Sequence, residues 1–153
     1  CLQAHMAAIT AVNAGESWDA PHNITGWVMT EGLVKLGLHK VELKKLIKSE
    51  AYKDFYMQRA GHWLGIDVHD VGDYKIDGKW RLMEPGMVTT IEPGIYVAPD
   101  NTSVDKKWRG IGIRIEDDVL VTRTGHRVIS EGAPKTVEEI ERFMAQSRAC
   151  AVA

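Results

Sequence analysis

Two histidines and two glutamates between residues 62 and 116 are of the types that bind metal ions or move protons. His62 and His69 lie seven residues apart in the glycine-rich stretch GHWLGIDVHDVGDY, and Glu92 and Glu116 follow downstream. The glycines argue against a helix here, and the spacing differs from the His-x-x-x-His of a helical zinc site. Both rings can therefore line one cleft only if the chain bends, most readily at Gly65. A pair of hydrogen-bonded structural histidines is the alternative.

Glu92 follows a predicted strand in a segment that contains Glu-Pro-Gly twice. The stretch GMVTTIEPGIYV (86–97) is rich in β-branched residues and is bounded by Gly and Pro, which predicts a strand. Because Pro-Gly suits the centre of a type II turn, we expect Glu84 and Glu92 each to lie at a corner. Val88 and Thr90 would share a face with Glu92. A carboxylate held in this way suits a metal ligand or a general base, whereas Glu84 is predicted to be exposed.

The stretch GIGIRIEDDVLVT (110–122) is the second predicted strand. Its alternation would direct Ile111, Ile113 and Ile115 to an apolar face and Gly112, Arg114 and Glu116 to the other. The polar face is either one wall of a site or a solvent-exposed surface with a weak salt bridge. One His with two Glu would form a ligand set that suits Mn²⁺, Co²⁺, Fe²⁺ or Zn²⁺.

The remaining elements predict a single α+β unit, with helices packed on a curved, mostly antiparallel sheet. Residues 1–56 read as mostly helical: one helix ends at Gly15, and a second begins near Ser17. The second helix is expected to direct apolar side chains to the core, namely Ile24, Trp27, Val28, Val34 and Leu36. VELKKLIK predicts a short amphipathic turn with a solvated lysine face.

The C-terminal third predicts a strand, a turn around Gly125, a return strand and a final helix. In TVEEIERFMAQSR, Thr136 and Glu139 match a capping box. This helix carries an apolar stripe formed by Val137, Ile140, Phe143 and Met144.

Composition limits the classes of partner. The chain has 153 residues, 19 basic and 21 acidic, and a formal net charge of −2. No basic block is present, so nucleic acid and anionic membranes are not expected as partners. No apolar run is long enough to span a bilayer. Cys1 and Cys150 have no metal-binding spacing and no signal peptide is evident, so we expect a cytoplasmic location with incidental thiols.

Three blocks, GHWLGIDVHDVG, EPGMVTTIEPGIYV and RGIGIRIEDD, occur in this order and resemble those of the aminopeptidase P (Xaa-Pro aminopeptidase) family. That family belongs to the pita-bread metallopeptidases, which include prolidase and methionine aminopeptidase. Weaker similarity over GLVKLGL and the final helix extends the resemblance to nearly the whole chain. The resemblance implies a pita-bread fold and metal-dependent hydrolysis of the bond before a proline in the second position of a peptide.

The same resemblance implies two divalent metal ions, most often Mn²⁺, with Co²⁺ or Zn²⁺ as alternatives. It makes His62 a ligand of one ion and Glu116 a bridge between both. Glu92 would bind a metal ion and take the proton of a shared water, whose pKa the cations lower. The full-length family often forms homo-oligomers, which we therefore expect here.

Four further residues receive roles from the resemblance. His69 would contact the substrate near the scissile bond, Arg114 would steady the site, and Tyr96 would hydrogen-bond nearby. Gln58 stands where the family commonly has a His, four residues before the ligand His62. Its amide is neutral at pH 7, so it either weakens activity or specificity or replaces one hydrogen bond with another.

The chain departs from the family in its aspartates. The family takes two further metal ligands from an Asp-x10-Asp motif, and no two aspartates here are eleven positions apart. We therefore expect residues 1–153 to be the C-terminal part of a catalytic domain, incomplete and inactive alone. Asp67, Asp70 and Asp73 match no ligand position and are expected to hydrogen-bond within their loop. A prolidase and a non-catalytic peptide-binding or protein-binding module remain alternatives.

Overall fold

The computed structural model describes residues 1–39 and 41–150. Helices fill the first third of the chain and short strands the middle, as the sequence predicts. The elements in chain order are α1 (Leu2–Thr10), α2 (Ala20–Lys35), α3 (Leu43–Lys48), the 3-10 helix η1 (Ala51–Asp54), β1 (Lys75–Ile76), β2 (Lys79–Trp80), β3 (Val88–Ile91), β4 (Gly94–Tyr96), the 3-10 helix η2 (Lys106–Trp108), β5 (Gly112–Arg114), β6 (Asp117–Thr122), β7 (Gly125–Val128) and α4 (Val137–Cys150).

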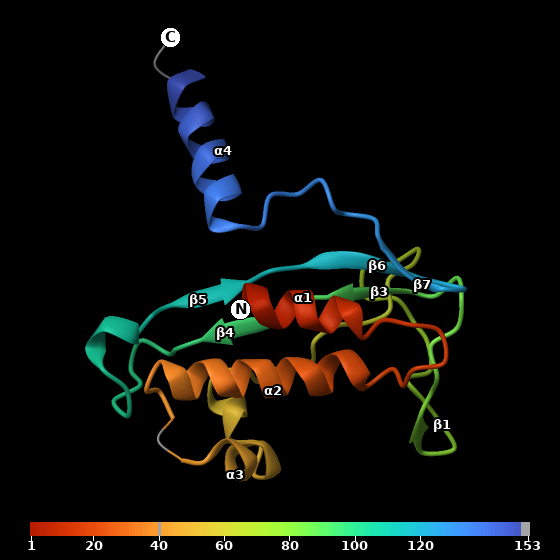
Figure 1. Ribbon diagram of the computed structural model, residues 1–153, viewed down its shortest axis with the longest axis horizontal. Helices are drawn as coiled ribbons and strands as arrows, with labels where there is room; N and C mark the ends of the chain where they lie inside the picture. Colours follow the sequence, from red (N-terminus) through yellow and green to blue (C-terminus); the bar gives the residue numbers. More distant parts are fainter. Residues whose placement is uncertain (40, 151–153) are drawn as a thin grey trace.

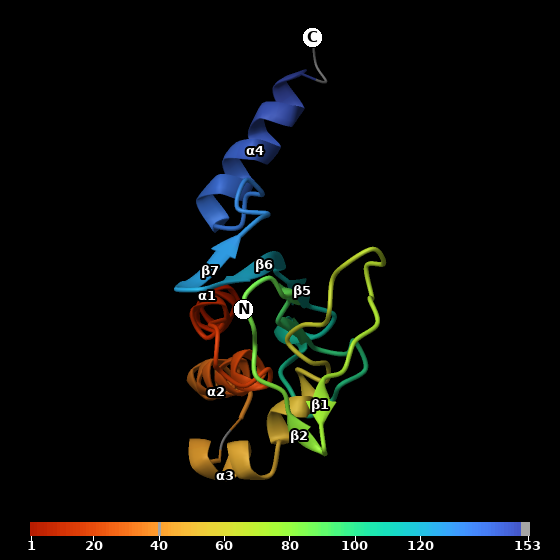
Figure 2. The ribbon, with the colours of Figure 1, turned by 90° about the vertical axis from the view of Figure 1, so that its right-hand side faces the viewer.

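The helices α1 and α2 pack together on one side of the strands, and α3 lies beyond α2 (Figure 1). The loop that carries the two histidines lies on the opposite side (Figure 2). Every strand pair within the described residues is antiparallel. The predicted α+β architecture is therefore confirmed.

Each of the two long predicted strands is broken in two, and the breaks adjoin. β3 pairs with β6 and β6 with β7, whereas β4 pairs with β5 in a separate ladder. The first break falls at Glu92–Pro93 and the second at Ile115–Glu116. Ile91 is the register partner of Asp117, and Gly94 that of Arg114. Both glutamates therefore lie where one ladder gives way to the next.

Of the three predicted turns, the first agrees with the structure and the other two differ from it. Gly86 has φ of 98°, which suits the turn expected after Glu84. Gly94 is absent from the positive-φ residues and instead opens β4, so the second predicted type II turn is wrong. The turn expected around Gly125 falls at residues 123–124, and Gly125 begins the return strand.

The core has two adjoining apolar clusters. One joins α1 and α2 to the η1 region through Met29, Leu33 and Tyr56. The other joins α1 to β3 and β6 through Ala8, Ile91 and Val119, with further buried residues Val12, Trp18, Met83 and Val121. The second cluster supports the strands whose ends carry the two glutamates.

The two N-terminal helices are shorter than predicted, and α2 buries another face. α1 ends at Thr10, well before Gly15, and α2 begins at Ala20 with Pro21 in its first turn. The predicted core residues Ile24, Trp27 and Leu36 are exposed. The helix buries its opposite side instead, including Pro21, Thr25, Gly26, Met29, Thr30 and Leu33.

The capping box of α4 is confirmed, because the backbone N–H of Thr136 donates to Glu139 and that of Glu139 donates to the Thr136 hydroxyl. Its apolar stripe is largely exposed, since α4 projects away from the sheet (Figure 1). Within the described part of the chain, no helix combines the length and apolarity needed to cross a bilayer. Cys1 is a free thiol, and the side chain of Cys150 lies outside the described residues.

Candidate metal centre

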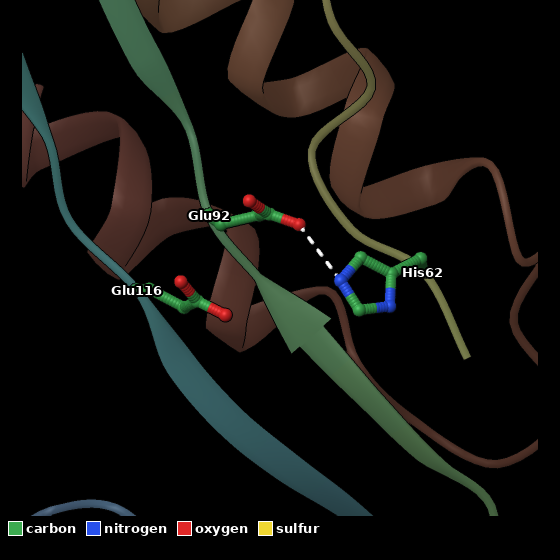
Figure 3. A group of neighbouring side chains, drawn as sticks. All are labelled: His62, Glu92 and Glu116. Carbon is green, nitrogen blue, oxygen red and sulfur yellow. Dashed lines mark ion pairs between the residues drawn. The ribbon is translucent and has the colours of Figure 1, made fainter. Parts of the chain in front are cut away.

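Three backbone segments lie side by side and bring His62, Glu92 and Glu116 together (Figure 3). The segment before the histidine loop runs along β3: the N–H of Thr90 donates to the carbonyl of His62 at 3.0 Å. The N–H of Glu92 donates to the carbonyl of Ala60 at 2.6 Å. On its other side β3 pairs with β6, which Glu116 immediately precedes. The middle segment therefore carries Glu92, with a candidate ligand on each side.

The three side chains converge closely enough to share a metal ion. One ligand atom from each of His62, Glu92 and Glu116 lies within 4.8 Å of the others. The His62 Nε2 atom is 3.1 Å from Oε1 of Glu92. Glu92 is buried, His62 is partly buried and Glu116 is exposed. Of all groups of His, Cys, Asp and Glu in the described residues, this is the one whose geometry suits a metal ion.

The hydrogen bonds of His62 assign its tautomer. Its Nδ1 atom lies 2.7 Å from the carbonyl oxygen of Trp63, which can only accept, so Nδ1 carries the proton. In the neutral form of the ring, the Nε2 lone pair would face the Glu92 carboxylate. Two electron-rich atoms at this distance repel unless a proton or a cation lies between them. The donor set therefore fits a divalent cation held by nitrogen and oxygen.

Glu92 is held in place by several neighbours. The Thr90 hydroxyl donates to Oε1 at 3.2 Å, and Nη1 of Arg114 donates to Oε2 at 3.0 Å. Nε of Arg114 also donates to the Tyr96 hydroxyl at 2.7 Å. The Gln58 amide donates to the backbone carbonyl of Glu92 at 3.1 Å. The structure thus brings Gln58, Arg114 and Tyr96 into one network around Glu92, while their catalytic roles stay predictions.

Glu116 has a raised pKa, chiefly because partial burial disfavours its charged form. The negative charges of Glu92 and Asp118 raise the pKa further, whereas His62 and Arg114 lower it. Two neighbouring carboxylates repel when both are ionised, and a divalent cation between them would remove that repulsion.

The predicted bend in the histidine loop is present. The ring centroids of His62 and His69 are 4.5 Å apart, with the rings edge to face. At Gly65 an added Cβ would lie 1.8 Å from Oδ2 of Asp70, so a larger residue would displace the Asp70 carboxylate where the loop folds back. The Asp70 carboxylate accepts from the N–H of Val71 at 2.9 Å, which agrees with the hydrogen bonding within the loop expected of that aspartate.

Two polar residues near the centre received no role from the sequence. Thr90 was expected to share a face with Glu92, and that alternation was the available signal for its hydrogen bond. Asp117 adjoins Glu116 and is 2 % exposed. Nothing local in the sequence marks it, because its partners come from distant segments.

The model of metallopeptidase family M24 matches residues 1–123. The chain belongs to this family. The chain is 43 % identical over 143 residues to the Xaa-Pro aminopeptidase of Haemophilus influenzae, and the match covers 94 % of this chain and 33 % of that protein. These matches confirm the resemblance to aminopeptidase P.

Solved structures agree with the family assignment. The Pseudomonas aeruginosa aminopeptidase PepP shares 59 % identity and a TM-score of 0.95, over 97 % of this chain and 34 % of that one. Zinc-substituted Escherichia coli aminopeptidase P in complex with product shares 43 % identity and a TM-score of 0.89, over 95 % of this chain and 32 % of that one. The pita-bread fold prediction is confirmed, and the chain spans about a third of the length of these relatives.

Proposed function

We propose that this chain supplies three metal ligands of an Xaa-Pro aminopeptidase, His62, Glu92 and Glu116. The intact protein would release the first residue of peptides that have proline in the second position. The observation that carries the proposal is the convergence of these side chains, with ligand atoms within 4.8 Å, in a chain of family M24. The name of the Haemophilus relative supports the substrate class.

Two divalent cations, Mn²⁺ by preference and Co²⁺ or Zn²⁺ as alternatives, would supply a hydroxide at neutral pH by lowering the pKa of a shared water. His62 offers Nε2, because its Nδ1–H is bonded to the Trp63 carbonyl. Glu92 offers a carboxylate fixed by Thr90 and Arg114, which suits both metal binding and acceptance of the proton of that water.

The remaining neighbours would act on the substrate. His69 stands beside His62 on the exposed side of the centre and can donate to a peptide carbonyl or to the leaving proline nitrogen. Two further ligands would come from an aspartate pair in another part of the intact protein, and a homo-oligomer would be its active form.

The test uses the intact protein with a tripeptide of the form Xaa-Pro-Xaa and the matching Xaa-Pro dipeptide. We expect release of the first residue with Mn²⁺ present, and loss of turnover after metal removal with EDTA. Tripeptide cleavage distinguishes an aminopeptidase from a prolidase, which would cut the dipeptide alone. Undiminished activity in metal-free protein would refute the proposed mechanism, and peptide binding without cleavage would support a non-catalytic module.

A matched pair of glutamate variants locates the activity. Glu116→Ala should abolish turnover, because one carboxylate serves two cations. Glu84→Ala is the control: Glu84 is exposed and pairs with Arg81 at 3.1 Å, outside the candidate centre. Near-normal kcat in Glu116→Ala would rule out the bridging role.

A further inference from the structure

A buried carboxylate lies directly behind Glu116. The burial of β6 alternates, so that Asp117, Val119 and Val121 face the core. Successive side chains of an extended chain point to opposite faces, and Glu116 turns toward His62 and Glu92 (Figure 3). Asp117 is 2 % exposed and points to the other side.

Three segments distant in sequence converge on Asp117. The Ser130 hydroxyl, after β7, donates to Oδ1 at 2.6 Å, and Nζ of Lys135, before α4, lies 3.2 Å from the same oxygen. Nε2 of His5, which is buried in α1, lies 3.2 Å from Oδ2. Figure 2 shows α1 next to β6 and β7. His5, Asp117, Ser130 and Lys135 are called the Asp117 cluster below.

The Asp117 cluster also fixes the backbone beside Glu116. The Ser130 hydroxyl accepts from the N–H of Asp118 at 2.9 Å while it donates to Asp117. The N–H of Ile129 donates to the carbonyl of Asp118 at 2.9 Å. The Ser130 hydroxyl therefore holds both the side chain of Asp117 and the N–H of the next residue.

Glu116 has no comparable support of its own. Across residues 1–39 and 41–146, whose side chains are described, no donor makes a hydrogen bond or ion pair with its carboxylate. Glu92 differs, because Thr90 and Arg114 hold its two oxygens. The position of the Glu116 carboxylate therefore depends on its backbone, which the Asp117 cluster anchors one residue away.

We infer that the Asp117 cluster is a positioning element that holds Glu116 in reach of the metal ions. The inference rests on the proposed function, because it assigns Glu116 to the metal centre. The cluster touches neither substrate nor metal. It acts through the backbone at 116–118, and loosening it would weaken metal binding without removing any ligand.

The experiment measures Mn²⁺ binding to the intact protein by calorimetry, below the thermal transition of every variant. Ser130→Ala removes one neutral hydroxyl and both of its bonds to residues 117 and 118. We expect the Mn²⁺ Kd to rise by about tenfold, with a larger rise in Asp117→Asn. Ser130→Thr keeps the hydroxyl and should restore the Kd.

The control variant is Thr30→Val. Thr30 is fully buried in α2, where its hydroxyl donates to the carbonyl of Gly26. Its loss should leave the Mn²⁺ Kd at the wild-type value, whatever the change in Tm. A purely structural Asp117 cluster would behave like Thr30.

Wild-type Mn²⁺ affinity in Ser130→Ala, with only the Tm reduced, would overturn the inference and leave the proposed function intact. Failure of the wild-type protein to bind any divalent cation would overturn the proposed function, and the inference with it. If Asp117→Asn does not fold, Ser130→Ala and Ser130→Thr decide the outcome.

Discussion

Replacing Gly94 by alanine tests how strongly the link from Tyr96 through Arg114 supports Glu92. A Cβ on Gly94 would lie 2.5 Å from the Tyr96 hydroxyl and 2.8 Å from two carbons of the ring. Gly94 lies in β4 without a positive φ, so the backbone accepts alanine. The tyrosine ring must therefore move, and it must release Nε of Arg114, which now lies 2.7 Å from its oxygen.

The expected loss of Mn²⁺ affinity follows from the energy of this hydrogen bond. A hydrogen bond to a charged group contributes about 1.5–3 kcal/mol. The Arg114 side chain is 46 % exposed, and solvent screening reduces that to about 1 kcal/mol. If this free energy no longer supports Glu92, the Mn²⁺ Kd of the intact protein rises roughly fivefold. Tyr96 is half-buried and can swing outward, so the free energy of unfolding should fall by only about 1 kcal/mol.

Calorimetry of Mn²⁺ binding and urea unfolding measure the two effects separately. Gly112→Ala is the matched control, because Gly112 is the register partner of Tyr96 and its Cβ would approach the ring only to 3.3 Å. Tyr96→Phe removes the hydroxyl without crowding and should match Gly94→Ala in Kd. Wild-type Mn²⁺ affinity in both Gly94→Ala and Tyr96→Phe would refute the reasoning.

Three further predictions concern side chains around this centre and at the C-terminal helix. Gln58→Leu removes the donor to the Glu92 carbonyl and should lower the unfolding free energy by about 1 kcal/mol, measured in urea; an unchanged midpoint would contradict this. Burial, helped by Arg59, lowers the pKa of His22 from 6.5 to about 4. As the pH falls, His22 is therefore protonated in the unfolded chain before it is protonated in the folded one. Stability should fall as the pH drops from 6.5 toward 4, and NMR titration would give the pKa of His22 in the folded chain. Backbone N–H groups of Thr136 and Lys135 lower the pKa of Glu139 from 4.5 to about 2; its contribution should be present above pH 4.5 and lost toward pH 2, and absent in Glu139→Gln.

The local chemistry of the site was readable from the sequence. Alternation placed Glu92 at a strand end with Thr90 on its face, and the glycine content of the histidine loop predicted the bend at Gly65. These features depend on neighbours within a few positions, which the sequence contains. The metal-binding role of the three ligands came from the family resemblance, because spacing alone left an exposed polar face as the alternative.

The burial of α2 could not be predicted from its apolar pattern. Thr25 and Thr30 are buried because their hydroxyls donate to carbonyls one turn earlier, within the helix. Gly26 is buried because the Tyr52 ring lies against it, 3.4 Å from where a Cβ would be. Only the packing of another segment reveals this, whereas hydropathy favoured Ile24 and Trp27.

The broken strands have a similar origin. Ile111 and Ile113 were expected to complete an apolar face, yet they are 38 % and 49 % exposed. β5 pairs with the short β4 and not with the ladder that continues through β6, so Ile113 and the preceding Ile111 lie outside the two core clusters. Which strand pairs with which depends on long-range contacts.

Because His62, Glu92 and Glu116 come from three adjacent backbone segments, a cation bound by all three would join those segments as a cross-link. Unfolding separates the segments and releases the cation, so binding and folding are thermodynamically coupled. At a free cation concentration a hundred times its Kd, the native state would gain about 2.7 kcal/mol. The Tm of the intact protein should then rise with added Mn²⁺, making thermal stability a direct measure of how far the metal centre is filled.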